Sequence, residues 1–205
     1  YGICQAPRMP THHLVPADLA KNYEVHEWRN ACGVLATAYP DEWTDIQTVL
    51  RGFRLRKSQI VAPGGNKSDL SKSFDGPLME LGWVEKQFRT GILLDGNTLE
   101  SPTHKIDCYK NGVALEIEWN NKDPFYDRDL NNFRLLFDLR AIGVGVIVTR
   151  CDALQKIFNA LGKGSSYGNS TTHMSKLLPR IEGGGGGGCP IVVFGISERL
   201  YDENA

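Results

Sequence analysis

The spacing of apolar residues changes along the chain from a helical to a strand-like pattern. Residues 16–39 and 43–50 carry apolar positions mostly at helical spacing, which predicts largely helical structure in both segments. A third helical stretch is predicted from about residue 67 to residue 88, with a break at Gly76 and Pro77. The first part of the chain is therefore expected to be mainly helical.

Beyond the third helix, the apolar pattern predicts strands that alternate with helices. The expected elements are a β-hairpin over 105–119, a helix over 127–142, a buried strand over 143–149, helices over 152–161 and 171–178, and a strand that ends at Ile196. Two apolar strands separated by helices imply a sheet that helices cover and that is at least partly parallel. The predicted fold class is α/β, with a central mixed β-sheet flanked by helices.

The length of 205 residues fits one compact domain with a full hydrophobic core. Within this single domain, residues 1–22 are interpreted as an N-terminal extension, and residues 183–188, all glycine, as a mobile surface loop rather than a phosphate-binding loop. Hydrophobic residues at 41% and charged residues at 23% are typical of a soluble globular protein. No apolar run approaches the ~20 residues of a membrane-spanning helix, so no membrane partner is expected.

Charge and cysteine spacing narrow the classes of function only slightly. A net charge of −1 neither predicts nor excludes a nucleic-acid partner, because acidic metal ligands offset basic phosphate contacts in a nuclease. Basic residues gather over 51–67, where we expect a loop. The five cysteines are odd in number and are never spaced as CxxC, which indicates neither a disulfide framework nor a zinc site. A reducing cytoplasm is the expected location.

The most distinct local signal is the pair Asn111-Gly112, which is preferred in a two-residue type I′ hairpin turn. This turn places Asp107 opposite Glu116, and Lys105 opposite Glu118. Because side chains alternate between the faces of a strand, these residues share one face of the hairpin. The opposite face is apolar and carries Val113, Leu115, Ile117 and Trp119.

Carboxylates that face each other across two strands need a neutralising partner. Directly opposed residues have Cβ atoms ~5 Å apart, a separation at which like charges destabilise the pair. Asp107 and Glu116, with a strand carbonyl and waters, would form the hard oxygen site that suits Mg²⁺. Alternatively, the acids only face solvent, and Lys105 forms a surface ion pair with Glu118. The apolar character of the adjoining strand and helices favours the metal site.

The segment DCYKNGVALEIEW, residues 107–119, resembles the catalytic hairpin of PD-(D/E)xK nucleases, where an Asp on one strand precedes an acidic-x-Lys on the next. Glu118 stands at the usual lysine position, as in some endonucleases similar to BamHI, whereas those of the BglII type have Gln there. Three further segments resemble BglII- and BstYI-like restriction endonucleases: NACGVLATAYPDEWTDI, the stretch from GGNKSD to GWVEKQF, and the strand after the catalytic helix. The resemblance covers about residues 23–196.

This resemblance implies a type II restriction endonuclease that hydrolyses phosphodiester bonds in double-stranded DNA with Mg²⁺. Asp107 and Glu116 would hold the metal, and Glu118 would orient or deprotonate the attacking water. Glu85 would be a further catalytic carboxylate carried by a helix, or alternatively a helix glutamate that faces solvent. The expected DNA contacts are Lys86, Arg89 and Lys105.

The resemblance also implies partners and a location. A homodimer would read a short palindrome, because two-fold symmetry in the protein matches two-fold symmetry in the site. Relatives often recognise sites that contain GATC. A cognate DNA methyltransferase would be encoded separately, and the enzyme would act in a prokaryotic cytoplasm.

Two other functions are open to the same residues. The first is another PD-(D/E)xK metal nuclease, such as a repair or junction-resolving enzyme without strict sequence preference. The second is a non-catalytic DNA-binding or cation-binding protein whose hairpin acids are structural. Discrete bands from a plasmid digest distinguish a restriction enzyme from the first, and metal-dependent cleavage that Glu116→Ala abolishes excludes the second.

Overall fold

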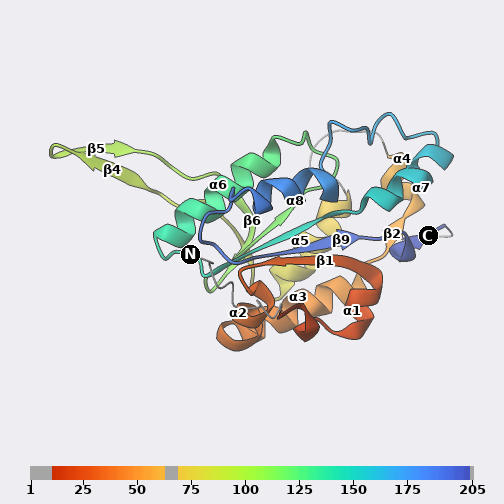
Figure 1. The fold of residues 1–205 in the computed structure, drawn as a ribbon, viewed down its shortest axis with the longest axis horizontal. Coiled ribbons are helices and arrows are strands. Elements are labelled where there is room, and N and C mark those ends of the chain that lie inside the picture. Colours follow the sequence, from red (N-terminus) through yellow and green to blue (C-terminus); the bar gives the residue numbers. More distant parts are fainter. Residues whose placement is uncertain (1–10, 63–68, 204–205) are drawn as a thin grey trace, which may run out of the picture.

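The computed structural model describes residues 11–62 and 69–203, except for the side chain of His12. Its centre is a six-stranded sheet in the order β1-β9-β8-β7-β6-β3 (Figure 1). The strands are β1 (Tyr23–Trp28), β3 (Val84–Lys86), β6 (Ile106–Lys110), β7 (Val113–Ile117), β8 (Val144–Arg150) and β9 (Ile191–Ile196). Strands β7, β8 and β9 are parallel, whereas β1, β6 and β3 run antiparallel to their neighbours. The sheet is mixed, and the predicted α/β class is confirmed.

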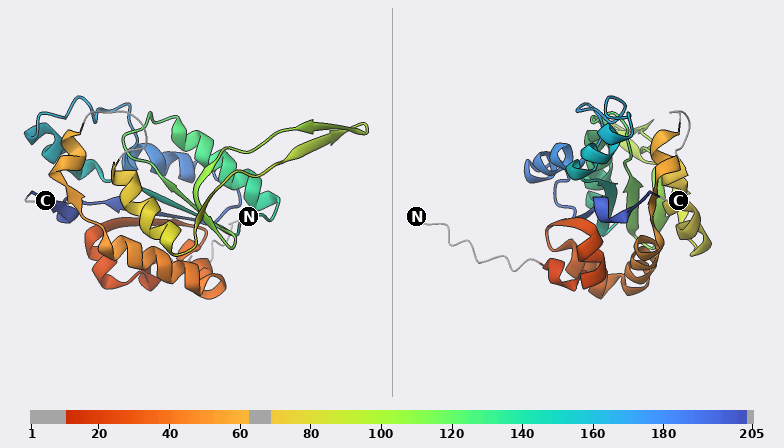
Figure 2. Two further views of the ribbon diagram at one scale, coloured as in Figure 1. Left: turned by 180° about the vertical axis from the view of Figure 1, so that it is seen from behind. Right: turned by 90° about the vertical axis from the view of Figure 1, so that its right-hand side faces the viewer.

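Helices cover both faces of this sheet, as Figures 1 and 2 show. One face packs against α1 (Ala17–Asn22), α2 (Ala31–Ala38), α3 (Pro40–Gly52), α5 (Asp69–Glu80) and α7 (Gln155–Ala160). The other face packs against α6 (Phe125–Asp138) and α8 (Met174–Glu182). The alternation of the strands thus gives two hydrophobic clusters, one on each side of the sheet.

Short elements complete the chain at its margins. They are η1 (Thr11–Leu14), β2 (Leu55–Arg56), α4 (Lys57–Val61), η2 (Asp152–Leu154), η3 (Glu198–Leu200) and β10 (Tyr201–Asp202). Strand β10 pairs in parallel with β2, which ties the end of the described chain to the region after α3. No helix in the described residues has the length and apolar character needed to cross a bilayer.

The expectation of a largely helical segment over residues 16–39 is wrong in its middle. Residues Tyr23–Trp28 form the edge strand β1, paired antiparallel with β9. Arg29 and Asn30 then adopt positive φ angles of 56° and 55°, and α2 begins at Ala31. Only Tyr23 of β1 is buried, so the strand lacks the long apolar signal of a central strand, and its hydrogen bonds to β9 decide its structure.

The third helix is shorter than predicted, and its expected break does not occur. Helix α5 runs through Gly76 and contains Pro77, but it ends at Glu80. Gly82 then turns the chain with a φ angle of 87° and leads into strand β3. Glu85 therefore lies on a strand, and the prediction that it projects from a helix is wrong.

The basic region over residues 51–67 is not simply a loop. Part of it forms β2 and α4, where Ile60 is buried in the core. Residues 63–68 lie outside the described residues, as does most of the GGNKSD segment.

An element that the sequence analysis did not predict is a two-stranded ribbon of β4 (Gly91–Leu94) and β5 (Asn97–Glu100). The ribbon follows β3 and precedes β6 in the chain, and all residues of its two strands are exposed. It extends away from the body of the molecule (Figure 1). Asp95 and Gly96 form its turn with positive φ angles. The two strands of the ribbon pair with each other and form a separate sheet.

The glycine run packs more closely than a loosely attached loop would. Gly186 is buried, and an added Cβ there would come within 2.4 Å of Ile191 Cδ1. An added Cβ at Gly187 would come within 2.6 Å of Arg134 Cγ, so the turns lie against α6. Residues with side chains do not fit at these two positions without movement, which explains part of the low-complexity run.

Candidate active site

The hairpin turn at Asn111 and Gly112 forms as predicted. Both residues have positive φ angles, 44° and 90°, and the Asn111 side chain donates a 2.7 Å hydrogen bond to Glu42. The pairs Lys110–Val113, Tyr109–Ala114 and Cys108–Leu115 are those that the turn predicts. The residues expected on the apolar face of β7, and Trp119 after it, all lie in the cluster that packs against α2, α3 and α5.

At Asp107, hydrogen bonds from backbone amides to side-chain carboxylates replace the regular backbone pairing of the hairpin. The Asp107 amide donates to Glu116 Oε2 at 3.2 Å, and the Ile117 amide donates to Asp107 Oδ2 at 3.0 Å. On its other side, β6 has a register shift against β3 between the pairs Val84–Tyr109 and Lys86–Ile106. Such a bulge re-aims side chains in a strand. The structure thus brings Asp107 and Glu116 together, each carboxylate on an amide of the other strand.

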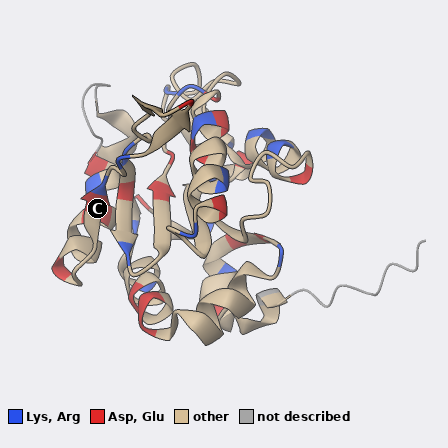
Figure 3. Cartoon of the chain, turned by 90° about the vertical axis from the view of Figure 1, so that its left-hand side faces the viewer, with Lys and Arg blue, Asp and Glu red and all other residues tan. Residues whose placement is uncertain are grey.

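Two more carboxyl groups join these residues, and one of them was not predicted. Glu118 follows β7 and is 2% exposed, and Asp129 on α6 is fully buried. Glu118 and Asp129 lie close enough for each carboxyl group to shift the pKa of the other. We call Asp107, Glu116, Glu118 and Asp129 the acidic cluster. Figure 3 shows acidic positions in the middle of the sheet beside a helix that carries both acidic and basic positions.

Burial makes Glu116, Glu118 and Asp129 hard to ionise. Desolvation raises the pKa of Glu116 well above its usual range, and the charges of Asp129 and Asp107 raise it further. Desolvation also raises the pKa of Glu118 to about 9, with a further increase from Asp129. The pKa of Asp129 is raised by burial and lowered by its bonds to Glu118 and Arg128. Arg128 lies closer to Asp129 than to Glu118, so its positive charge stabilises the Asp129 carboxylate more strongly. Of these two acids, Glu118 is therefore the one that retains a proton.

Two side chains, those of Asn121 and Arg128, hold Glu118 directly, and Thr172 fixes the segment that carries Asn121. The Asn121 side chain donates to Glu118 Oε2 at 2.8 Å, and Arg128 Nη2 lies 3.4 Å from Oε1. The Asn121 backbone is held in turn by Thr172, whose hydroxyl accepts the Asn121 amide at 3.1 Å. Arg150, 1% exposed, fixes the adjoining segment by donating to the Tyr167 carbonyl and to the Thr171 hydroxyl.

The predicted basic and additional acidic residues lie outside this buried group. Glu85 is 42% exposed and forms a 2.7 Å ion pair with Lys105, so Lys105 does not pair with Glu118 as the alternative interpretation proposed. Lys86 Nζ lies over the rings of Phe88 and Tyr109, at 5.2 and 5.4 Å from their centres. Arg89 is exposed in the segment that leads to the β4–β5 ribbon.

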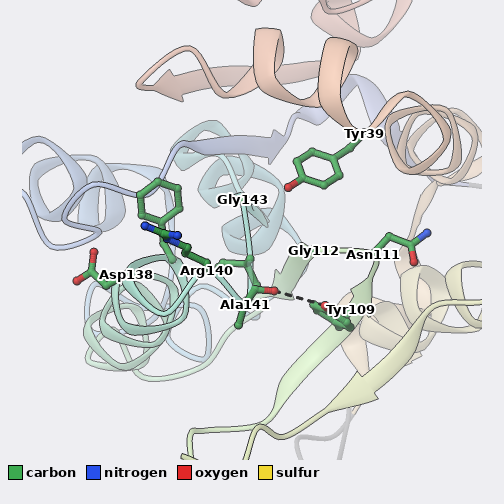
Figure 4. Close-up of a pocket in the computed structure, with 10 residues that line it drawn as sticks. Tyr39, Tyr109, Asn111, Gly112, Asp138, Arg140, Ala141 and Gly143 are labelled. Atoms are coloured by element: carbon green, nitrogen blue, oxygen red, sulfur yellow. Dashed lines mark hydrogen bonds between the residues drawn. The ribbon is translucent and has the colours of Figure 1, made fainter.

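A pocket of about 710 Å³ lies at the other end of the hairpin, beside the turn. Tyr39, Tyr109 and Arg140 are among its lining residues, and the Tyr109 hydroxyl donates to the Ala141 carbonyl at 3.4 Å (Figure 4). Its lining contains no member of the acidic cluster. The chemistry of the site is therefore not located in this pocket.

Sequence reasoning missed Asp129, although a signal for it exists. Tyr126, Leu130 and Phe133 form the buried stripe of α6 at helical spacing, and Asp129 falls within that stripe. An acid in the buried stripe of a helix that directly follows an acidic hairpin requires a polar partner. Among the described residues that partner is Arg128, and Glu118 at the end of the hairpin lies close by.

The carboxylate oxygens of the hairpin are suitable ligands for a divalent cation such as Mg²⁺. Among the described residues, no three His, Cys, Asp or Glu side chains are arranged to hold a metal ion, so a pair of carboxylates must suffice. Mg²⁺ is commonly held by one or two carboxylates, with water and substrate phosphate as its other ligands. Within the described part of the chain, Glu116 Oε1 has no hydrogen-bond partner although it is buried, and a buried oxygen normally has one. A cation beside Asp107 and Glu116 would satisfy that oxygen.

Comparison with known proteins supports the same interpretation of the fold. The family model described as restriction endonuclease BglII/BglIII matches residues 23–196, which include the whole six-stranded sheet and the acidic cluster. A search of curated proteins gave no match. The match extends over most of the chain and confirms the resemblance inferred from the hairpin and its flanking segments. The chain belongs to the BglII/BglIII family of restriction endonucleases, which are nucleases that bind and cut double-stranded DNA.

Proposed function

We propose that this chain is a type II restriction endonuclease that cleaves double-stranded DNA at a short palindromic site with Mg²⁺. The observation that carries the proposal is the hydrogen bonding of two carboxylates across the hairpin, Glu116 to the Asp107 amide and Asp107 to the Ile117 amide, because it fixes both carboxylates side by side on the neighbouring strands β6 and β7. The unpartnered Glu116 Oε1 supports a cation there. Family membership supports DNA as the substrate.

The roles of the hairpin residues follow from their bonds. Asp107 and Glu116 would hold the metal ion, and the backbone amides of the opposite strands keep both carboxylates in place. When bound, Mg²⁺ polarises a phosphate oxygen and lowers the pKa of a coordinated water. A bound cation would also offset part of the cost of burying charge that raises the pKa of Glu116 and of Glu118.

Glu118 would act on the attacking water. Once deprotonated, its carboxylate accepts a proton from the water as the water oxygen bonds to phosphorus and the bond from phosphorus to the leaving oxygen breaks. Asn121 holds Oε2 at 2.8 Å, which leaves Oε1, on the Arg128 side, to face the substrate. Glu85 remains a weaker catalytic candidate, because its carboxylate pairs with Lys105.

DNA contacts and assembly complete the proposal. Lys86 lies on the edge strand β3, Arg89 follows that strand and Lys105 directly precedes β6, and we place the DNA phosphates along this side of the hairpin. A homodimer would present two such sites to the two strands of a palindrome. A separately encoded methyltransferase would protect host DNA at the same sequence.

The test is digestion of a plasmid of known sequence with Mg²⁺ or with EDTA, followed by mapping of the cut ends. We expect discrete fragments with Mg²⁺, a single short palindrome at every end, and intact DNA in EDTA. A smear or cleavage confined to branched DNA would indicate a repair or junction-resolving nuclease. Binding without cleavage under all conditions would indicate a non-catalytic DNA-binding protein.

A further inference from the structure

A cation from α6 stands beside the residue that replaces the motif lysine. The hairpin carries Glu118 at the position where the wider nuclease motif has lysine, so the hairpin itself supplies no positive charge there. Arg128 Nη2 lies 3.4 Å from Glu118 Oε1. Helix α6 therefore supplies, through Arg128, the positive charge that the hairpin lacks at this place.

The guanidinium of Arg128 is fixed on one edge and accessible on the other. Its Nε and Nη2 lie 2.9 and 2.8 Å from Asp129 Oδ1, and its plane lies over the Phe125 ring at 4.3 Å. In the part of the chain that the structure describes, its Nη1 has no hydrogen-bond partner. The side chain is 32% exposed, whereas Glu118 and Asp129 are buried.

From this geometry we infer that Arg128 is a catalytic residue that contacts the scissile phosphate, a role that rests on the proposed function. A guanidinium presents its donors as a planar fork that matches phosphate oxygens, and its charge does not depend on local pH. Fixed donors lower a barrier most where negative charge develops during the reaction. Asp129 is then a positioning residue, because it holds the fork through Nε and Nη2.

The alternative is that Arg128 only offsets the charge of the acidic cluster. Both roles predict damage when the cation is removed, so loss of activity alone does not separate them. They differ when the acid beside it is neutralised at the same time. A charge-offsetting Arg128 is no longer needed once the Asp129 carboxylate has been replaced by a neutral amide, whereas a phosphate contact is still missing.

The experiment uses Arg128→Gln, Arg128→Lys and the double change Arg128→Gln with Asp129→Asn, with Arg134→Gln as the matched control. Arg134 lies on the same helix, is exposed and bonds only Asn131 among the described residues. Single-turnover cleavage is measured with Mg²⁺ and enzyme in excess. DNA affinity is measured with Ca²⁺ across a series of salt concentrations, and thermal unfolding checks that each variant is folded.

We expect Arg128→Gln to cleave ~100-fold more slowly or worse, Arg128→Lys to lie between it and the wild type, and the double variant to show no recovery. Arg128→Gln should also reduce the slope of log affinity against log salt by ~0.9, the value for one lost phosphate contact. Arg134→Gln should cleave within about twofold of the wild type, since it removes one exposed charge away from the cluster.

Wild-type rates in Arg128→Gln, or recovery in the double variant, would overturn the inference. If Arg128→Gln does not fold, the Lys variant decides, because it retains the charge but not the fork, and unreduced cleavage there excludes a fork-dependent contact. If the wild-type chain does not cleave DNA with Mg²⁺, the proposed function fails instead. The salt slope of binding then still decides whether Arg128 contacts a phosphate.

Discussion

At Glu116, burial and three neighbouring acids all raise the pKa, because each disfavours the charged carboxylate. The backbone amide of Asp107 offers a single hydrogen bond in compensation. Glu118 is better supplied, with Asn121 on one oxygen and Arg128 near the other. The metal-free protein therefore disfavours charge on Glu116 and Glu118, whereas the proposed metal site needs charged carboxylates.

The first residue-scale prediction concerns the two proposed metal ligands. Asp107→Asn and Glu116→Gln should each abolish Mg²⁺-dependent cleavage, because an amide oxygen is a neutral and weaker ligand. Both changes preserve an acceptor for the amide across the hairpin. Site-specific binding measured in Ca²⁺ by gel shift should persist, and the unfolding temperature in EDTA should not fall. Cleavage by either variant at the wild-type rate would remove that residue from the metal site.

The second prediction concerns pH. The pKa of Glu118 rises from an ordinary 4.5 to about 9 in the folded chain, so the folded state holds a proton that the unfolded state releases. This contribution to stability is fully present below pH 4.5 and is lost as pH rises towards 9. Melting temperatures in EDTA should therefore fall across this window, beyond any fall in Glu118→Gln. Mg²⁺ should reduce the fall by binding the charged cluster, and identical pH profiles for wild type and Glu118→Gln would refute the assignment.

At the scale of elements, local signals proved more informative than long patterns. The residues Asn111 and Gly112 favour the conformation of the turn by themselves, and the register of β6 against β7 follows from that turn. Strand β1 was missed because an edge strand with one buried residue has little apolar signal of its own. The end of α5 before Glu85 was missed because the apolar spacing continues past Gly82 into β3. Asp129 was missed because Glu118, the acid that it approaches, is 11 residues away on another element.

Packing between α6 and the sheet gives a prediction at this scale. An added Cβ at Gly145 on β8 would lie 2.5 Å from Phe133 Cδ2, and Phe133 is fully buried. Gly145→Ala should therefore destabilise the protein by ~1–3 kcal/mol, as overpacked cores do. The measurement is denaturant unfolding in EDTA. A shift of the helix should also lower cleavage, because α6 carries Asp129 and Arg128.

The matched control for this substitution is Gly52→Ala at the end of α3. No atom lies within 4 Å of an added Cβ there, so the change removes only the flexibility of glycine. We expect it to be neutral or to stabilise the protein by ~0.5–1 kcal/mol. Equal losses of stability at both positions would show that the Phe133 contact is not the cause.

At the scale of the whole molecule, the described chain is a covered sheet with one uncovered projection. The β4–β5 ribbon exposes Ile92, Leu93, Leu94 and Leu99, each more than half exposed. It contains no lysine or arginine between Gly91 and Glu100, in contrast to the flanking residues Arg89 and Lys105. The sequence pattern did not predict that these side chains are exposed, because apolar residues in a strand usually lie in a core.

The whole-molecule prediction is the assembly state. Light scattering of the protein with Ca²⁺ and a short duplex that contains the mapped site should give the mass of two chains on one duplex. Two-fold symmetry in a palindrome requires the same contacts twice, which one chain cannot make at once. A complex with a single chain per duplex, cutting one strand at a time, would contradict the dimer.

The order of strands in the sheet also has a consequence for how the chain is made. Strand β1, near the start, has β9, near the end, as its neighbour in the sheet, and β9 also borders β8. During synthesis, β1 emerges long before residues 191–196 exist to pair with it. Contacts between such distant segments form slowly, because the loop between them must close first. A nascent chain that stops before Ile191 holds the complete acidic hairpin but lacks an interior strand of its sheet, so the six-stranded sheet can close only after residues 191–196 have been made.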